Sequence, residues 1–131
     1  MPHLQIEINK SLTDDDRIQL AAEVKRLFAR VMDTGTEHVA TSIREYGTYS
    51  LDLGRVTDHG KGVALVNADL RQGRTLQQRR ALAVGVIELL ERLLRVPPEH
   101  VYVTFTEHKG EDFHLQERYL ADWAKGEEPL V

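Results

Sequence analysis

The sequence predicts a two-layer α/β (α+β) sandwich, in which two β-α-β repeats form a four-stranded sheet with two helices on one face. Two observations lead to this prediction. Each half of the chain carries a strand, a helix and a second strand in that order, and the two halves match at a constant spacing. A right-handed crossover in each unit makes its two strands parallel.

The first half shows the pattern of one β-α-β unit. HLQIEIN at 3–9 alternates apolar and polar residues, which is typical of a half-buried strand. Thr13 with Asp16 three residues later predicts a helix N-terminus, and Gly35 closes the helical segment. VATSIREY at 39–46 then alternates as a second strand. The helix between them carries an apolar stripe at Leu20, Val24, Leu27, Phe28 and Val31.

The second half repeats this pattern when 62 is added to each residue number. The strand-like GVALVNADL occupies 62–70, Thr75 replaces the capping threonine, and EHV at 37–39 recurs at 99–101. A cap, a stripe and a tripeptide at one spacing favour an internal duplication over a chance similarity of two units. The second helical stripe is Leu82, Val86, Leu89, Leu90 and Leu93.

Length and composition predict a single domain, because 131 residues with 41% hydrophobic content suffice for one ordinary core. The repeat units span about 2–46 and 64–108. A glycine-rich linker at 47–62 is interpreted as a loop or short hairpin. The tail at 109–131 carries a weak helical pattern in FHLQERYLADWA at 113–124.

Composition argues against several classes of protein. The sequence contains no apolar run near the roughly 20 residues of a membrane helix and no signal-peptide pattern, so we expect a cytoplasmic protein without membrane contact. The absence of cysteine excludes disulfides and thiol catalysis. A net charge of -4 without a long basic run argues against nucleic acid as a partner. The six histidines include the cluster HKGEDFH at 108–114, but its spacing fits no metal site.

Four residues stand in only one half of the repeat, and packing of the duplicated scaffold explains none of them. They are Pro2, Arg44, Arg71 and Arg74. Because a duplicated scaffold keeps the residues that pack, chemically different positions are candidates for a site that is built once. Their equivalents in the other half are Ala64, Thr106, Asn9 and Leu12.

Pro2 has two interpretations. A proline in second position commonly does no more than permit methionine removal. The same removal would also give Pro2 a free secondary amine, and an apolar pocket or nearby arginines would lower the pKa of that amine below the 7.7–8.0 of a peptide α-amine. A neutral amine at physiological pH could act as a general base. If Met1 stays attached, the Pro2 nitrogen is an amide without basicity.

The arginines also have two interpretations. Arg74 directly precedes the predicted cap Thr75, where unpaired N–H groups and the helix dipole favour an anion, and a guanidinium can hold a carboxylate with two hydrogen bonds. Alternatively, Arg71 and Arg74 are solvated loop charges and Arg44 lies on an exposed sheet face. The aromatic residues Tyr46, Tyr49, Tyr102 and Trp123 are interpreted first as buried packing residues, with a pocket lining as the alternative.

Three short motifs stand out: MPHLQIE at the start, IRE around Arg44, and VNADLRQGRT before the second helix. Together they resemble the tautomerase superfamily, which includes 4-oxalocrotonate tautomerase and macrophage migration inhibitory factor. In order and spacing the chain is most similar to 5-carboxymethyl-2-hydroxymuconate isomerase, over residues 1 to about 107.

The resemblance implies a cofactor-independent and metal-free keto-enol tautomerase of aromatic catabolism, acting on a small unsaturated oxo or hydroxy carboxylic acid. Pro2 would be the catalytic base, and Arg44 and Arg74 would bind the substrate carboxylate and polarise its oxygen. Arg71 matches the first of two substrate-binding arginines in the related cis-3-chloroacrylic acid dehalogenase, with Arg74 as the second. The family also implies a homotrimer with sites at subunit boundaries.

Departures from the family pattern leave other activities open. A related decarboxylase has an aspartate near Glu37 or His38, so decarboxylation, hydration or dehalogenation of a three-carbon acid are alternatives, as is a non-catalytic binding protein on the same fold. Glu111 could reach the position of the water-activating glutamate of the dehalogenase with a small shift. The ungapped matches to that enzyme's histidine, tyrosine and glutamate are Arg30, Thr104 and Leu115.

Overall fold

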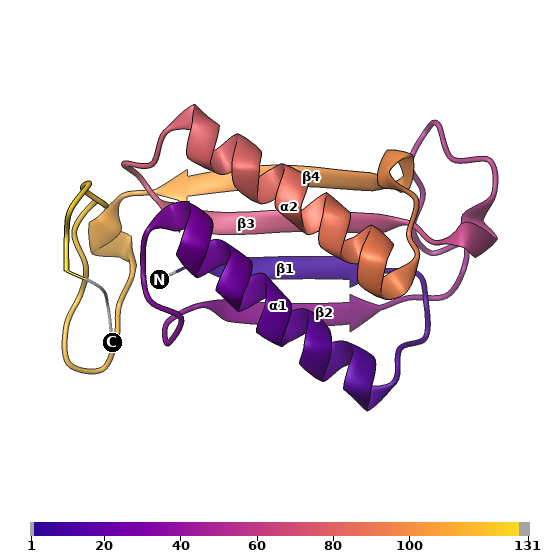
Figure 1. Cartoon of the computed structure of the whole chain (residues 1–131), viewed down its shortest axis with the longest axis horizontal. Helices are drawn as coiled ribbons and strands as arrows, with labels where there is room; N and C mark the ends of the chain where they lie inside the picture. Colours follow the sequence, from indigo (N-terminus) through magenta and orange to yellow (C-terminus); the bar gives the residue numbers. More distant parts are fainter. Residues whose placement is uncertain (1, 129–131) are drawn as a thin grey trace.

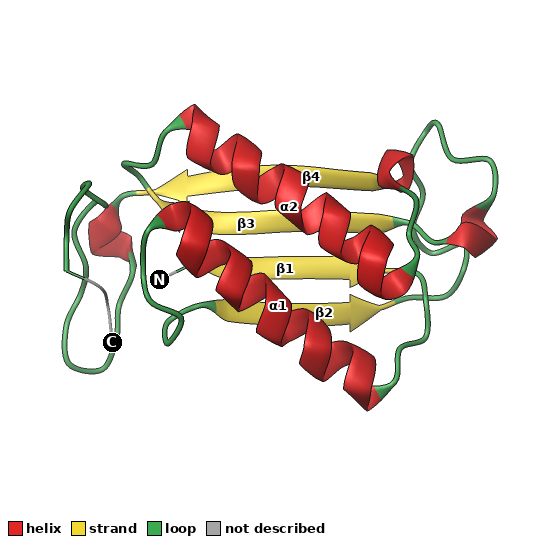
Figure 2. Cartoon of the chain, in the orientation of Figure 1, coloured by secondary structure: helices red, strands yellow, loops and turns green. Residues whose placement is uncertain are grey.

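The computed structural model describes residues 2–128, which form two layers with both helices on one face of a four-stranded sheet (Figures 1 and 2). The predicted fold class is confirmed. No helix in the described part of the chain is long and apolar enough to span a membrane. The strands are β1 (His3–Ile8), β2 (Ala40–Glu45), β3 (Ala64–Arg71) and β4 (Val101–His108), and the helices are α1 (Asp14–Met32) and α2 (Leu76–Leu94).

The two repeats join through their first strands. The sheet order is β2-β1-β3-β4, with β1 parallel to β2 and β3 parallel to β4, as the crossover rule predicts. Between the repeats, β1 and β3 pair antiparallel, with Ile6 opposite Val66. Equivalent residues of the two repeats therefore lie at opposite ends of the sheet.

The duplication extends to the helix ends. Each helix has 19 residues, and α2 begins and ends 62 residues after α1. Thr13 and Asp16 form a capping box at α1, and Thr75 and Gln78 form the equivalent box at α2. The reciprocal hydrogen bonds of these boxes occupy N–H groups that the first helical turn leaves unpaired.

An ion pair fastens each helix start to the second strand of its repeat. Arg17 Nε lies 2.7 Å from Glu45 Oε2, and Arg79 Nη1 lies 3.1 Å from Glu107 Oε1, again at the spacing of 62. Glu45 also accepts a hydrogen bond of 2.8 Å from the Leu12 N–H. The same tie in both halves indicates a structural role.

The hydrophobic core lies between the helices and the sheet. Both predicted helical stripes face it, and residues of β1 and β3 alternate into it. Its largest fully buried side chains are Phe28, Leu4, Ile6, Ile8, Leu20, Met32, Leu70, Leu82 and Leu90.

The other face of the sheet is open and mostly polar. The Gln5 side chain donates to Asp69 at 2.8 Å, and the Asn67 side chain donates to Thr104 at 2.9 Å. Side-chain hydrogen bonds therefore connect neighbouring strands on this face. By strand register and alternation, its residues are His3, Gln5, Glu7, Ala40, Ser42, Arg44, Leu65, Asn67, Asp69, Tyr102, Thr104 and Thr106.

The linker and the tail lie at opposite ends of the sheet (Figure 1). The linker is a loop with one short 3-10 turn at His59–Lys61, and its Leu51 and Val56 form a small apolar cluster with Val63. The tail contains no α-helix over 113–124, so the helical prediction there is wrong.

The tail instead folds by docking its apolar residues separately onto the end of the sheet. Leu120 and Trp123 are buried, and the backbone N–H of Trp123 donates a hydrogen bond of 2.8 Å to the backbone carbonyl of Gln72. A 3-10 turn at Gly110–Asp112 and an isolated bridge between His114 and Tyr119 complete the segment. Contacts with the sheet end thus override the local helical pattern.

The tie at Glu45 predicts a pH-dependent contribution to stability. The pKa of Glu45 lies below its ordinary value of 4.5, because Arg17 and then the Leu12 N–H donate hydrogen bonds to the charged carboxylate. A depressed pKa in the folded state stabilises the protein above the unfolded-state pKa, and this contribution is lost as pH falls through the folded-state pKa. Glu45→Gln should therefore lower Tm at pH 7, and the difference from wild type should shrink below pH 4.5.

Thermal unfolding followed by circular dichroism at several pH values measures this difference. Glu37→Gln is the matched control, because Glu37 is exposed and has no partner among residues 2–128. A Tm difference for Glu45→Gln that persists unchanged at pH 3 would show that the residue acts through shape and not through its charge.

Candidate functional site

Pro2, Arg71 and Arg74 lie at the same end of the sheet. Pro2 is buried, and its carbonyl accepts a hydrogen bond of 3.0 Å from the Ala40 N–H. His3 pairs with Asp69, so the antiparallel register places Pro2 beside the last residues of β3. Arg71 ends that strand, and Arg74 lies in the turn before α2. Strand pairing between the repeats thus brings together three of the four predicted site residues.

The Arg71 side chain is held beneath the tail and is only 3% exposed. Its Nη1 donates to Ala121 O at 2.8 Å, and its Nη2 donates to Glu127 Oε2 at 3.1 Å. Its Nε is buried and has no hydrogen-bond acceptor. The interpretation of Arg71 as a solvated loop charge is therefore wrong, because the tail covers it.

Arg74 is also buried, with 6% of its surface exposed. Its guanidinium carbon lies 4.8 Å from the ring centre of Trp123 and 5.7 Å from that of Phe28. Its polar contacts are weak, because Nη2 and Nε lie 3.3 and 3.4 Å from Met32 O. The alternative of a solvated charge fails here as well.

Burial makes the Arg74 cation costly. Desolvation, and then repulsion from the Arg71 charge, lower the pKa of Arg74 to about 10. The side chain nevertheless stays protonated at neutral pH. Two neighbouring guanidiniums, both largely shielded from water, concentrate positive charge here, and electrostatic attraction for an anion is stronger in such a place than at a solvated surface.

The tail is fitted tightly over this end. Gly73 has φ of 125°, and a Cβ there would collide with the Trp123 carbonyl oxygen. A Cβ at Gly110 would likewise overlap the Ala121 backbone, while the Gly110 N–H donates to Asp122 Oδ1 at 2.6 Å. Both glycines are therefore required by the close approach of the tail backbone.

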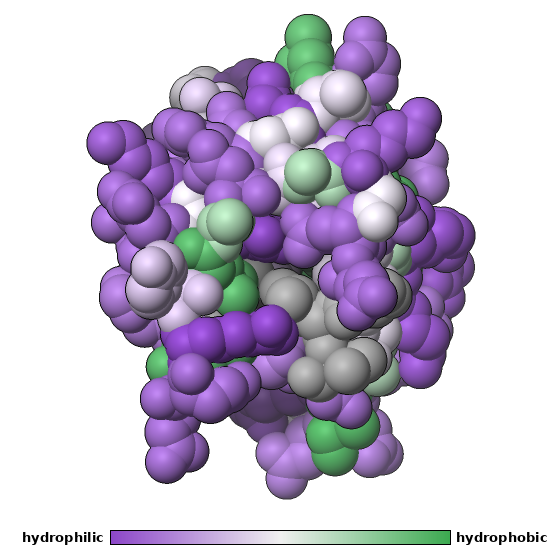
Figure 3. Space-filling view, turned by 90° about the vertical axis from the view of Figure 1, so that its left-hand side faces the viewer, coloured by the Kyte–Doolittle hydropathy of each residue, from purple (hydrophilic) through white to green (hydrophobic). Residues whose placement is uncertain are grey.

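A hollow of about 390 Å³ remains beside the buried Arg71, between the tail segments. Figure 3 views this end of the molecule, where hydrophilic side chains dominate the surface around smaller apolar areas. Charged side chains of both signs line the hollow. Its lining includes Arg71, Arg118, Asp122, Glu127 and Glu128.

Arg44 does not join this site within one chain. In the register of β1 and β2 it lies opposite Glu7, near the far end of the sheet from Pro2. Its side chain is exposed on the open face, where Nη1 lies 3.4 Å from Gln5 Oε1. It lines a separate hollow of about 230 Å³ with neighbours that include Tyr102 and Thr104. The expected grouping of Arg44 with Pro2 and Arg74 is thus absent from the single chain.

The positions that correspond to other family activities are dispersed. Thr104 lies on the open sheet face, and Glu111 lies on the exposed turn at the start of the tail. Leu115 directly follows His114 of the isolated bridge between His114 and Tyr119, and Glu37 and His38 precede β2. In the described part of the chain, Thr104, Glu111, Leu115 and Glu37 make no hydrogen bond or ion pair with Arg71 or Arg74.

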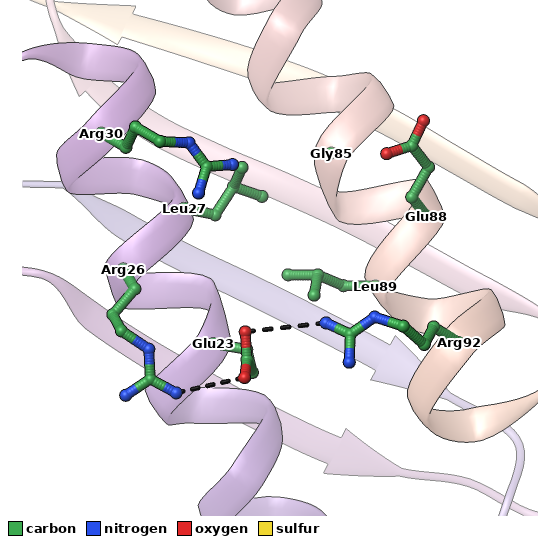
Figure 4. A pocket seen from close by; sticks show the side chains of 8 residues that line it. All are labelled: Glu23, Arg26, Leu27, Arg30, Gly85, Glu88, Leu89 and Arg92. Carbon is green, nitrogen blue, oxygen red and sulfur yellow. Dashed lines mark hydrogen bonds and ion pairs between the residues drawn. The ribbon is translucent and has the colours of Figure 1, made fainter.

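Arg30 lines the groove between the two helices (Figure 4). In that groove of about 260 Å³, Glu23 bridges Arg26 at 3.1 Å and Arg92 at 3.6 Å. Its acidic and basic groups largely neutralise each other on the solvent side of the helix layer. The groove therefore offers no concentrated charge comparable to that of the two buried arginines.

The histidine cluster has local partners. His108 lies 2.8 Å from Asp69, and the rings of His114 and Tyr119 are 6.0 Å apart. Within residues 2–128, no group of three His, Cys, Asp or Glu is placed to hold a metal ion. Tyr49 and Tyr102 are exposed, so the packing prediction is wrong for them, whereas Trp123 is buried.

Sequence reasoning missed two residues of the site, Trp123 and Glu127. The sequence favours packing for Trp123, with a pocket lining as the alternative, but does not predict its contact with Arg74. Glu127 stands in an acidic, glycine-containing stretch with no periodic pattern. No local signal links either residue to arginines some 50 positions earlier, because tail docking creates these contacts.

Comparisons with known proteins bear on the fold and on part of the chain. A family model described as "Tautomerase enzyme" matches residues 65–122, which include Arg71 and Arg74 but not Pro2 or Arg44. A search of curated protein sequences found no match.

Several solved structures share the fold. A member of the cis-3-chloroacrylic acid dehalogenase family is 24% identical, with TM-score 0.80 over 92% of this chain and 84% of that one. A fused 4-OT described as a symmetric trimer is 21% identical, with TM-score 0.78 over 95% and 99%. Macrophage migration inhibitory factor of Toxoplasma gondii is 18% identical, with TM-score 0.78 over 90% and 99%. The chain therefore has the β-α-β fold of the tautomerase structures.

The close fit at Gly110 makes tail docking testable. Gly110→Ala would place a Cβ against the Ala121 backbone, and relieving this overlap should destabilise the docked tail by about 1–3 kcal/mol. Because Trp123 is the only tryptophan, its fluorescence should shift to longer wavelength as the indole meets water. Intrinsic fluorescence with mild denaturant measures the effect.

Gly54→Ala is the matched control, since a Cβ at that position meets no atom within 4 Å. Identical fluorescence and unfolding curves for Gly110→Ala and Gly54→Ala would contradict the close docking of the tail on the site.

Proposed function

We propose that the chain belongs to the tautomerase superfamily and is a cofactor-independent keto-enol tautomerase or isomerase of a small unsaturated oxo or hydroxy carboxylic acid. The observation that carries this proposal is the burial of Arg71 and Arg74 beside Pro2. Two shielded cations select an acidic ligand, and an amino-terminal proline next to them supplies a base. The family match over 65–122 and the shared fold support the same class.

The proposed reaction needs Met1 to be removed, and Met1 lies outside the described residues. The free Pro2 amine would then sit near two positive charges, which disfavour its ammonium form and lower its pKa. The neutral amine takes a proton from one carbon of the substrate, so that the electrons of the C–H bond move to form an enolate. Pro2 then returns the proton at another carbon, and the enolate collapses to the isomeric ketone.

The arginines supply binding and charge stabilisation. One guanidinium holds the substrate carboxylate and fixes the reacting carbon near the base. The other can stabilise the negative charge that develops on the enolate oxygen, where low exposure strengthens the interaction. Within this class, a substrate like that of 5-carboxymethyl-2-hydroxymuconate isomerase, an activity of aromatic catabolism, is the finer proposal, based on the motifs around Pro2, Arg44 and Arg74.

Arg44 enters the proposal through a second copy of the chain. It lies on the open polar face of a sheet whose edge strands β2 and β4 each have one edge without a partner strand among residues 2–128. A homotrimer like that named for the fused 4-OT structures would cover these surfaces and could carry Arg44 to a neighbour's Pro2. The active site would then be shared between subunits.

A second candidate activity is water addition to a three-carbon acid or its dehalogenation. The fold match to the cis-3-chloroacrylic acid dehalogenase family and the adjacent Arg71 and Arg74 favour it. Against it, neither Thr104 nor Glu111 makes a hydrogen bond or ion pair with the two arginines in the described part of the chain. Tautomerisation needs only the base and the cations, so it ranks first.

The proposal predicts loss of turnover when either the base or the buried cation is removed. With Met1-free protein verified by intact mass, Pro2→Ala should reduce kcat/KM for enol mono- and dicarboxylates by roughly 10²- to 10⁴-fold. Arg74→Met keeps the apolar contacts with Phe28 and Trp123 but removes the charge, and should reduce kcat/KM by roughly 10²-fold. Ultraviolet absorbance of the enol measures ketonisation.

Arg80→Met is the control, because it makes the same change at an exposed position of α2. Turnover that survives in both Pro2→Ala and Arg74→Met would overturn the proposed mechanism. Absence of turnover in verified Met1-free wild type would move dehalogenation, hydration, decarboxylation and then non-catalytic binding to first place.

Sharing of the site between copies predicts complementation. Pro2→Ala and Arg44→Ala should each be weakly active alone, yet co-expressed they should recover about a quarter of the wild-type sites in randomly mixed trimers. The reason is that some boundaries then combine an intact Pro2 from one copy with an intact Arg44 from the next. Activity of the purified mixture, with subunit composition from native mass spectrometry, measures the recovery.

A mixture of Pro2→Ala with Arg74→Ala is the matched control, because these residues lie at the same end of one chain and no intact site should form. Equal activity of the two mixtures would mean that Arg44 does not act across a subunit boundary.

A further inference from the structure

Glu127 supplies a carboxylate to the buried anion site from within the chain. Its Oε2 lies 3.1 Å from Arg71 Nη2, and its Oε1 accepts a hydrogen bond of 3.1 Å from the Ala124 N–H. The tail turns back to make this contact, with Gly126 at φ of 84° and the Glu127 N–H donating to Ala124 O. The carboxylate thus occupies a position that an acidic ligand of Arg71 would need.

The contact leaves hydrogen-bond donors of the site unfilled. Arg71 Nε and Trp123 Nε1 are both buried and have no hydrogen-bond acceptor among residues 2–128. Arg71 is 3% and Trp123 7% exposed, so water does not readily replace the missing partners. Buried donors without acceptors are uncommon in folded proteins, and two of them beside an anion site indicate a ligand with more acceptor atoms than Glu127 presents.

Charge also remains uncompensated. Glu127 pairs with Arg71, whereas Arg74 has no carboxylate within ion-pair distance among residues 2–128. The charges that face Arg74 are the repelling Arg71 and the attracting Glu127 and Asp33, the last two without direct contact. A small dicarboxylate could satisfy both guanidiniums, which the single internal carboxylate does not.

The attachment of Glu127 is separable from that of the tail as a whole. Leu120 and Trp123 are buried and anchor the tail, but residues 124–126 are exposed and Glu127 is only partly buried. The Glu127 side chain is 24% exposed, compared with 3% for its partner Arg71. The turn at Ala124–Glu127 can therefore open while Trp123 stays against Arg74.

We propose that Glu127 is an internal competitor, a carboxylate that occupies the Arg71 site and that an acidic ligand must displace in order to bind. The ligand class, a small mono- or dicarboxylate, rests on the proposed function. The tail thereby sets the affinity of the site. Since the ligand binds only the open state, its apparent Kd equals the intrinsic Kd divided by the fraction of molecules in which Glu127 leaves the site open. A smaller open fraction therefore means weaker apparent binding.

Binding of malonate, an unreactive three-carbon dicarboxylate, tests the proposal without depending on turnover. Glu127→Gln keeps the shape of the side chain and removes its charge, and should lower the Kd for malonate roughly 3- to 30-fold. Glu117→Gln is the matched control, because it removes the same charge at an exposed position of the tail that neither contacts Arg71 nor lines the hollow beside it. Its Kd should stay within about twofold of wild type. Isothermal titration calorimetry measures the Kd.

Location and folding are controlled separately. Malonate should change the fluorescence of Trp123, the only tryptophan, and Arg71→Met should abolish binding. If Glu127→Gln unfolds, Glu127→Ala at the same site repeats the test, and circular dichroism identifies folded protein. Equal malonate affinity of wild type, Glu127→Gln and Glu117→Gln overturns the proposal, as does weaker binding by Glu127→Gln or the absence of binding by all of them.

Failure of this inference and failure of the proposed function give different results. Turnover that depends on Pro2 and Arg74, together with unchanged malonate affinity in Glu127→Gln, would refute only the internal competitor. Tighter malonate binding by Glu127→Gln without turnover of any enol acid would support the competitor and refute the tautomerase.

Discussion

The antiparallel pairing of β1 with β3 governs the rest of the structure. It joins two parallel β-α-β units so that the start of the first strand in one repeat meets the end of the first strand in the other. Pro2 of the first repeat therefore lies at the same end of the sheet as Arg71 of the second, and Ala64 lies with Asn9 at the opposite end. The residues at these positions differ between the two repeats. Because of the strand pairing, one end of the sheet carries the charged Arg71, and the other end carries the neutral Asn9.

The two ends of the sheet differ in how the buried polar side chain at the equivalent position is hydrogen-bonded. Asn9 is buried, and its side chain accepts a 2.6 Å hydrogen bond from the Val63 N–H and donates to linker carbonyls, so its amide is satisfied. Arg71 at the equivalent position carries a charge under the tail and retains an unpaired Nε. An apolar Leu12 in place of Arg74 completes the contrast. A purely structural role would favour the satisfied arrangement at both ends, so the charged end requires another explanation.

The fold was predictable from local patterns because they are written twice. Capping residues, apolar stripes and alternation at the spacing of 62 specify both units and their helix ends. Chemical differences between the two halves indicate Pro2, Arg71 and Arg74 as candidate site residues. Local patterns do not specify how the two repeats pair, so they do not predict that these residues lie at the same end of the sheet. The tail escaped prediction because Trp123 and Glu127 are positioned by docking against residues about 50 positions away, and this docking overrides the helical pattern of 113–124.

Two adjacent buried cations make sense as stored electrostatic energy. Desolvation, and then the Arg71 charge, lower the pKa of Arg74, which means that this cation is unfavourable before an anion arrives. Arg74 remains protonated at neutral pH, so the unfavourable interaction is not relieved by proton loss. Under the proposed function, a bound carboxylate or a developing enolate would relieve it, and the gain would be largest where the negative charge is greatest. An arrangement that costs folding energy therefore becomes an arrangement that favours acidic ligands and charged transition states.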